Sequence, residues 1–152
     1  MHLILLVCML IGEYRHKLDD KRRIALPAKF RRALGTSLVI TRGLDTCLFV
    51  FSTQQWQSIV EKLSQLSVGQ ADSRAFARYL FAGAAEVETD QLGRMLVPSE
   101  LAQHAKLAES AVLIGVNDRC ELWNEAAWDA YRTDVETQAD AVAEKLGSIG
   151  VL

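Results

Sequence analysis

A run of basic side chains between residues 15 and 32 is the part of this sequence best suited to chemistry. Only Asp19 and Asp20 oppose the positive charge of this run, and the chain as a whole has a formal net charge of −2. Positive charge gathered on one segment favours contact with phosphate groups, and arginine can also read base edges. A solvated basic surface without a partner is the simpler interpretation, and it stays open at this point. The run holds eight of the chain's seventeen lysines and arginines: Arg15, Lys17, Lys21, Arg22, Arg23, Lys29, Arg31 and Arg32.

The motif inside this run occurs twice. An Asp-x-x-x-Arg motif at residues 19–23 precedes one of the two prolines, and a second at residues 90–94 precedes the other, 71 residues later. So many ordered matches indicate a tandem duplication. With offsets of 71 to 73 residues, the correspondence includes the pairs Gly12 and Gly83, Phe30 and Leu101, Cys47 and Cys120, and Trp56 and Trp128.

Within each motif the carboxylate can hold the arginine. Asp19 and Asp90 could tie their loops through ion pairs with Arg23 and Arg94, and a carboxylate can also fix the arginine fork that reads a partner. Purely structural ion pairs are the alternative, and the two roles are compatible. Lys21 and Arg22 add cations in the first repeat only, so Arg23 is expected to contribute more to DNA binding than Arg94.

Arg15 and Lys17 are two further candidates for DNA contact, because alternate residues of a strand share one face. Their counterparts in the second repeat are Glu86 and Glu88. Two interpretations stay open. Either the first repeat is the main DNA contact, or the two strands lie near each other and form cross-strand ion pairs.

The sequence gives no support to catalysis, to a cofactor or to a metal site. No nucleophile–base pair recurs, and no glycine-rich phosphate loop occurs. The histidines and cysteines are scattered and lack the spacing of metal ligands. We therefore predict a protein that is not an enzyme, with neither a bound metal nor a small-molecule substrate.

The cysteines and tryptophans are better explained by packing. Three separated cysteines, without a disulfide framework, indicate a reducing cytoplasm. Cys47 and Cys120 occupy matching apolar positions, so they are expected to be buried structural thiols. Trp56 and Trp128 are expected to anchor helices rather than to stack on bases.

Each repeat predicts the same order of elements: strand, charged loop, strand, brief helix, strand, strand. In the first repeat the helix spans residues 28–34 and ends at Gly35, and the later strands span residues 38–41 and 47–51. Ser52 and Asn124 are expected to cap the helices that follow. One repeat is too small to bury its own apolar face. The predicted fold is therefore α+β, mainly β: a pseudo-twofold barrel of interleaved hairpins with peripheral helices.

The elements divide the chain into five parts. Residues 12–56 form a first module, 57–82 a helical connector, 83–128 a second module, and 129–152 an acidic amphipathic helix. Residues 1–11 are an apolar extension that is shorter than the ~20 residues of a membrane span and lacks the features of a signal peptide. Two interpretations of it stay open: an edge strand, or a start assigned too early, with Met9 as the natural first residue.

These residues resemble the MraZ family over about residues 9–146. The resemblance rests on residues 12–21 and 23–31, on the segment Thr-Arg-Gly-Leu-Asp at residues 41–45, and on residues 90–98 with Gly93 and Arg94. Members of that family begin just before the equivalent of Gly12, which favours Met9 as the start. Where this chain has Arg22 the family has glycine, so a positive φ at that site would cost energy.

The resemblance implies two swapped-hairpin modules of the SpoVT-AbrB type, assembled into a ring, usually an octamer. It further implies a cytoplasmic repressor on the nucleoid, which binds direct repeats in the promoter of its own division and cell-wall gene cluster. Double-stranded DNA would be contacted by Arg23 and Arg94, with Asp19 and Asp90 organising the loops. The alternative is an antidote-type protein of the same fold, which acts through protein contacts and binds DNA weakly and without specificity.

Overall fold

The computed structural model describes residues 9–150, and both repeats have the predicted order of elements. The first repeat forms β1 (Leu10–Lys17), β2 (Arg23–Ala25), α1 (Ala28–Leu34), β3 (Ser37–Arg42) and β4 (Leu48–Ser52). The second forms β5 (Ala85–Glu88), β6 (Arg94–Leu96), α4 (Ser99–His104), β7 (Ser110–Asn117) and β8 (Cys120–Asn124). Helices α2 (Thr53–Ser64) and α3 (Ala71–Ala82) connect the repeats, and α5 (Glu125–Gly147) follows β8. Both interpretations of the apolar extension concern residues 1–8, with Cys8, which lie outside the described residues.

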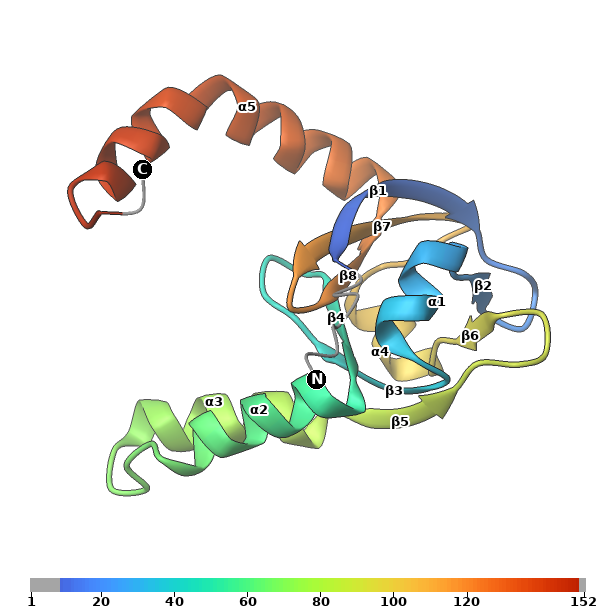
Figure 1. Cartoon of the computed structure of the whole chain (residues 1–152), viewed down its shortest axis with the longest axis horizontal. Coiled ribbons are helices and arrows are strands. Elements are labelled where there is room, and N and C mark those ends of the chain that lie inside the picture. The colour runs from blue at the N-terminus through green and yellow to red at the C-terminus, as the bar shows by residue number, and fades with distance from the viewer. Residues whose placement is uncertain (1–8, 151–152) are drawn as a thin grey trace, which may run out of the picture.

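The strands of the two repeats are interleaved, with an edge strand of each repeat paired to a hairpin of the other. Six of them form one antiparallel sheet in the order β1-β7-β8-β4-β3-β5 (Figure 1). If each strand is exchanged for its counterpart in the other repeat, the same order results, read from the opposite edge of the sheet. β2 and β6 pair with each other as a separate ribbon, in which Ile24 is opposite its own counterpart, Met95. The pseudo-twofold axis therefore passes through the Ile24–Met95 pair.

The closed barrel predicted from the sequence is wrong. Among the described residues, β1 and β5 are the two edges of an open sheet. The segments that could join these edges, β2 and β6, are three residues long and pair with one another instead. The broader prediction, an α+β fold built mainly on strands with helices outside them, is confirmed.

Both repeats contribute to one hydrophobic core. Ile24 and Met95 are fully buried beneath the ribbon, and Phe30 of α1 is fully buried against the edge of the Tyr14 ring, 5.0 Å between ring centroids. Burial of each such side chain contributes on the order of 1.5–3 kcal/mol. Because the two repeats share this core, the loops that precede β2 and β6 are held in place by the same set of packed side chains.

The helices begin and end at the predicted residues. Gly35 ends α1 in the left-handed region, with φ 78°. The side chain of Ser52 accepts the N–H of Gln55 at the start of α2, and that of Asn124 accepts the N–H of Ala127 at the start of α5. These caps confirm the boundaries read from the sequence.

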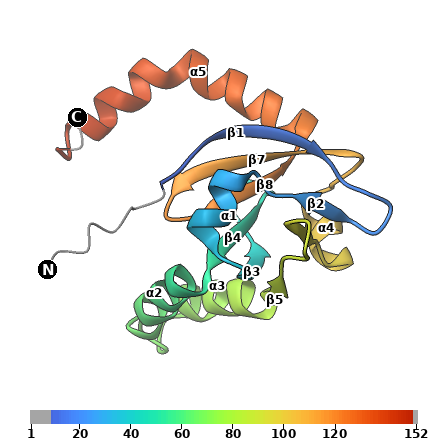
Figure 2. The ribbon, with the colours of Figure 1, turned by 45° about the vertical axis from the view of Figure 1, so that its right-hand side comes forward.

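Two helical parts extend away from the sheet (Figures 1 and 2). α2 and α3 lie side by side, and Trp56 packs between Phe51 and Phe81, with ring centroids 5.7 and 5.6 Å away. α5 leaves the body after its first turns and exposes apolar side chains, among them Tyr131 and Val135. In the described part of the chain, no helix combines the length and the apolar character needed to cross a membrane.

Candidate nucleic-acid interface

The first Asp-Arg loop, residues 18–23, is organised around the carboxylate of Asp19. Its Oδ1 accepts the backbone N–H of Lys21 at 2.9 Å and of Arg23 at 2.8 Å, while Oδ2 accepts Nε–H of Arg23 at 2.7 Å. The N–H of Asp19 donates to the carbonyl of Arg23, and the N–H of Arg22 donates to the carbonyl of Asp19. Asp19 therefore fixes the loop backbone and one side of the Arg23 guanidinium.

The second Asp-Arg loop, residues 89–94, repeats this geometry bond for bond. Asp90 Oδ1 accepts the N–H of Leu92 and of Arg94, each at 2.9 Å, and Oδ2 accepts Nε–H of Arg94 at 2.8 Å. The two backbone hydrogen bonds of the first loop also recur, between Asp90 and Arg94 and between Gly93 and Asp90. The predicted ion pairs are present in both repeats, and each carboxylate organises its loop as expected.

The two Asp-Arg loops lie side by side at one end of the molecule (Figure 1). Pairing of β2 with β6 sets Arg23 opposite Leu96 and Arg94 opposite Ala25. Nη1 of Arg94 reaches across to the first loop and lies 3.7 Å from Oδ2 of Asp19. The side chains of Arg23 and Arg94 are 31 and 30% exposed, so both guanidinium groups remain open to solvent.

Hydrogen bonds keep both carboxylates charged. The backbone N–H of Arg23 is the main cause that lowers the pKa of Asp19, and the guanidinium of Arg23 acts in the same direction. The pKa of Asp90 is lowered by the same two groups of Arg94, in the same order. Each aspartate is therefore ionised at neutral pH and offsets the charge of the arginine that it holds.

Arg22 occupies a backbone position that glycine takes in the second repeat. Its φ is 61°, and that of its counterpart Gly93 is 74°, so the site requires the left-handed region in both repeats. The carbonyls of Arg22 and Gly93 accept the N–H of Val97 and of Leu26 at 2.9 and 3.1 Å. Arg22 makes one bond that glycine cannot, from its Nε–H to the carbonyl of Val97 at 3.1 Å. That bond offsets part of the ~1–2 kcal/mol that an L-residue costs in this region.

Arg15 is placed differently from the loop residues. Its Nη2 lies 2.6 Å from Oδ1 of Asp129 and 3.3 Å from Oε2 of Glu13, so its charge is shared with β1 and α5. Lys17, at the end of β1, lines an open hollow of about 520 Å³ beside the first loop, together with Asp20 and Arg22. The structure therefore brings Lys17, but not Arg15, next to the first Asp-Arg loop.

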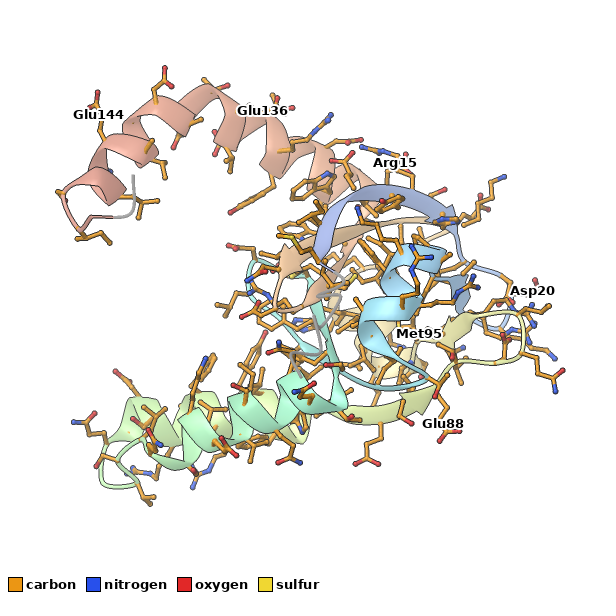
Figure 3. The ribbon with its side chains drawn as sticks, viewed as in Figure 1. Arg15, Asp20, Glu88, Met95, Glu136 and Glu144 are labelled. Atoms are coloured by element: carbon orange, nitrogen blue, oxygen red, sulfur yellow. The ribbon has the colours of Figure 1, made fainter. Side chains whose placement is uncertain are left out.

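Cross-strand ion pairs between β1 and β5, one of the two interpretations left open by the sequence, are wrong. β1 pairs with β7 and β5 pairs with β3, so the two strands are opposite edges of the sheet. Arg15 and Glu88 accordingly lie on different sides of the molecule (Figure 3).

Arg31 is a cation at this end of the molecule that was not singled out from the sequence. It belongs to α1, and its Nη1 donates to the carbonyl of Leu92 in the second Asp-Arg loop at 3.4 Å. A signal for it did exist, because Arg31 is part of the basic run while its counterpart is Ala102.

The cysteines and tryptophans serve packing, as predicted. Cys47 and Cys120 are buried, and burial raises the pKa of both thiols, that of Cys47 to about 12. Trp56 packs as described above. Trp128 packs on Trp123, 5.2 Å between ring centroids, and donates its Nε1–H to Glu13 at 2.7 Å. Within residues 9–150, no group of three or more His, Cys, Asp or Glu side chains could hold a metal ion.

Comparisons with known proteins place both repeats in one family. The family described as "MraZ protein, putative antitoxin-like" matches residues 9–79 and again residues 80–147. A protein of Caldanaerobacter subterraneus subsp. tengcongensis is 43% identical over 143 residues, which cover 94% of this chain and all of the relative. One from Moorella thermoacetica is 45% identical over 138 residues, or 91% of this chain and 96% of the relative. Both relatives are named transcriptional regulator MraZ, which agrees with the expectation that the chain is not an enzyme. With the duplicated loops on one face and matches over both repeats, this chain belongs to the MraZ family.

Proposed function

We propose that this protein is a transcriptional regulator that binds double-stranded DNA through its two Asp-Arg loops. The observation that carries the proposal is the identical hydrogen bonding of the two loops, combined with their position side by side on the β2–β6 ribbon. Each loop holds an arginine through Nε of its guanidinium, and both arginine side chains stay about 30% exposed. A guanidinium oriented in this way loses little rotamer freedom when it meets a phosphate or a guanine.

Lys17, Lys21 and Arg22 surround the first loop and are proposed as phosphate contacts. Their side chains belong to β1 and to the loop itself, and all three are exposed. Phosphate contacts supply affinity without sequence preference, whereas Arg23 and Arg94 are the candidates for base contact. Arg15 stays a candidate at the margin of this surface, since Asp129 shares its charge.

The target, assembly and location follow from family membership as further proposals. We infer a cytoplasmic, nucleoid-associated repressor of the promoter of its own division and cell-wall gene cluster, read as direct repeats. Two modules of the swapped-hairpin type, residues 12–56 and 83–128, would form the body. A ring such as an octamer would array their loops along the repeats. The exposed apolar side chains of α5 are suited to contacts between subunits.

Fluorescence anisotropy with the purified full chain tests the DNA-binding proposal. One duplex carries the promoter upstream of the protein's own gene, and the other is a scrambled duplex of equal composition, each titrated at several salt concentrations. The Arg23→Ala/Arg94→Ala double variant is measured beside the parent, with thermal melts to verify folding. We expect selective, salt-sensitive binding that the double substitution abolishes.

Equal and weak binding to both duplexes, unchanged in the double variant, would reject the proposal. That result would favour the second candidate, an antidote-type protein that acts through protein contacts. The salt series separates the two, because affinity that depends on phosphate contacts falls steeply as salt rises.

A further inference from the structure

Among the differences between the two Asp-Arg loops, the one at the residue before the arginine is balanced by a residue on the helix beside each loop. The first loop has Arg22 where the second has Gly93, and at the same offset of 71 residues α1 has Arg31 where α4 has Ala102. The two helices lie beside the loops of the opposite repeats, so each loop has one arginine and one small residue beside it: Arg22 with Ala102 at the first loop, and Arg31 with Gly93 at the second.

The exchange has a steric basis in the second loop. Arg31 of α1 lies directly over Gly93, so a Cβ added to that glycine would collide with the guanidinium and lie 2.6 Å from Cδ. The guanidinium donates to the carbonyl of Leu92, inside the second loop. A side chain at position 93 would therefore have to displace the Arg31 guanidinium as well as adopt the φ of 74°.

The first loop shows the reverse arrangement. Arg22 carries the long side chain itself and donates to the carbonyl of Val97, the residue before Pro98 and α4. Ala102 of α4 lines the same hollow as Arg22 and is the counterpart of Arg31. At the first loop, the large residue is in the loop and the small residue is on α4. At the second loop, the large residue is on α1 and the loop has glycine.

The net charge of the paired loops gives a reason for an arginine at both position 22 and position 31. The first loop has three basic and two acidic side chains, and the second has one of each. Without Arg22 the paired loops would have no net charge, because Asp19 and Asp90 offset the arginines that they hold. Arg22 and Arg31 are both exposed, and no carboxylate of the described residues lies within 4.0 Å of either guanidinium.

We propose that Arg22 and Arg31 are equivalent phosphate-binding residues, one beside each Asp-Arg loop, which together give the paired loops their positive charge. Arg31 thereby supplies to the second repeat the cation that Arg22 supplies to the first. The inference rests on the proposed DNA-binding function and adds to it a residue outside both loops. It also means that each loop has one such arginine, although Lys17 and Lys21 beside the first loop have no basic counterpart at the second.

A swap of the two side chains tests the proposal. The variants are Arg22→Gly, Arg31→Ala and the double variant Arg22→Gly/Ala102→Arg, which moves the arginine of the first repeat from its loop to α4. Arg78→Ala, an exposed arginine on α3, is the matched control. Affinity for the promoter duplex is measured by anisotropy over a salt series, with thermal melts for every variant.

Arg22→Gly and Arg31→Ala should each weaken binding about threefold to tenfold and lower the slope of log affinity against log salt by about one. The swapped double variant should regain the parental slope and affinity to within about twofold, and Arg78→Ala should change neither. Should the swapped variant fail to fold, Arg22→Lys and Arg31→Lys provide the decision, because a retained charge should retain the slope.

The inference is overturned if neither Arg22→Gly nor Arg31→Ala changes the salt slope. It is also overturned if the folded swap variant, or both lysine variants, bind DNA as weakly as Arg22→Gly and Arg31→Ala. Its failure is distinct from failure of the proposed function. Loss of binding in Arg23→Ala/Arg94→Ala with normal slopes in Arg22→Gly and Arg31→Ala rejects only the inference. Promoter binding that is unselective and unaffected by the Arg23 and Arg94 substitutions rejects the function itself.

Discussion

Arg15 and Asp129 join the edge strand β1 to the first turns of α5, with 2.6 Å between Nη2 and Oδ1. Beside them, Trp128 of α5 donates its Nε1–H to Glu13 of β1. Through these contacts a strand near the N-terminus holds the base of a long helix that otherwise leaves the body (Figure 2).

Replacement of Arg15 by alanine should therefore affect the fold more than DNA binding. We expect a small loss in the free energy of unfolding, as is usual for a solvent-exposed ion pair, measured by urea denaturation. The dissociation constant for the promoter duplex should change less than in Arg23→Ala. Lys17→Ala is the comparison on the same strand. A large loss of DNA affinity with unchanged stability would instead place Arg15 on the DNA-contact surface.

Protonation of the aspartates in the Asp-Arg loops should lower the stability of the fold below about pH 4. Hydrogen bonds from Arg23 and Arg94 lower the pKa of Asp19 and Asp90, and the hydrogen bond from Arg15 lowers that of Asp129. A carboxylate with a depressed pKa stabilises the fold above its unfolded pKa of about 3.9, and this contribution is lost as pH falls through the folded pKa. Melting temperatures should therefore be flat near neutrality and fall below about pH 4.

Replacement of Asp19 and Asp90 by asparagine should flatten that acid limb and lower the melting temperature at neutral pH. Asp20 is the control, since its side chain makes no hydrogen bond to the described residues. If Asp20→Asn flattened the limb equally, general charge repulsion rather than these two carboxylates would be its source.

Arg23 and Arg94 should contribute nearly equally to DNA binding. The sequence favours a larger contribution from Arg23, because only the first loop has Lys21 and Arg22. In the structure the two contributions are expected to be closer, because Arg31 adds a cation at the second loop, where it contacts the carbonyl of Leu92. Arg23→Ala and Arg94→Ala should weaken promoter binding by factors within about threefold of each other, since each removes one comparable contact. A difference of more than about tenfold would show that the first repeat dominates.

The ion pair between Arg119 and Glu121 should be a sensitive polar site away from the loops. Glu121 is 9% exposed and accepts hydrogen bonds from Arg119 and from Nε1–H of Trp123, each at 3.0 Å. Arg119→Met removes the cation and leaves a nearly buried carboxylate, which costs about 2–4 kcal/mol in unfolding free energy by chemical denaturation. The double substitution with Glu121→Leu should recover part of that loss. Arg132→Ala, whose ion pairs are 3.8 to 4.0 Å long, is the exposed control and should cost less than about 1 kcal/mol.

Local features of the fold could be predicted from the sequence because their causes are local. Gly35 ends α1, and Ser52 and Asn124 cap the helices that follow them, since each role depends on residues within one turn. The Asp-Arg loops were predictable for the same reason, because Asp19 and Arg23 interact across four positions.

The arrangement of strands could not be predicted in the same way. Closure of a sheet depends on which edges meet, and no short-range signal shows that β2 and β6 pair together rather than bridge β1 and β5. The role of Arg31 was missed for a related reason. Its relation to Gly93 spans more than 60 positions and becomes visible only once α1 packs against the second loop.

The interleaving of strands from the two repeats also affects when each strand finds its partner during synthesis of the chain. Among the described residues β1 pairs within the sheet with β7 alone, which leaves the ribosome about 100 residues later, and β3 is synthesised well before β5. At about 5–20 residues per second, β1 waits several seconds with its backbone unpaired. The glutamate, arginine and lysine of β1 are suited to that interval, because charged edge strands resist pairing with other chains. The first repeat can therefore complete its sheet pairing only after β7 and β5 of the second repeat have been synthesised.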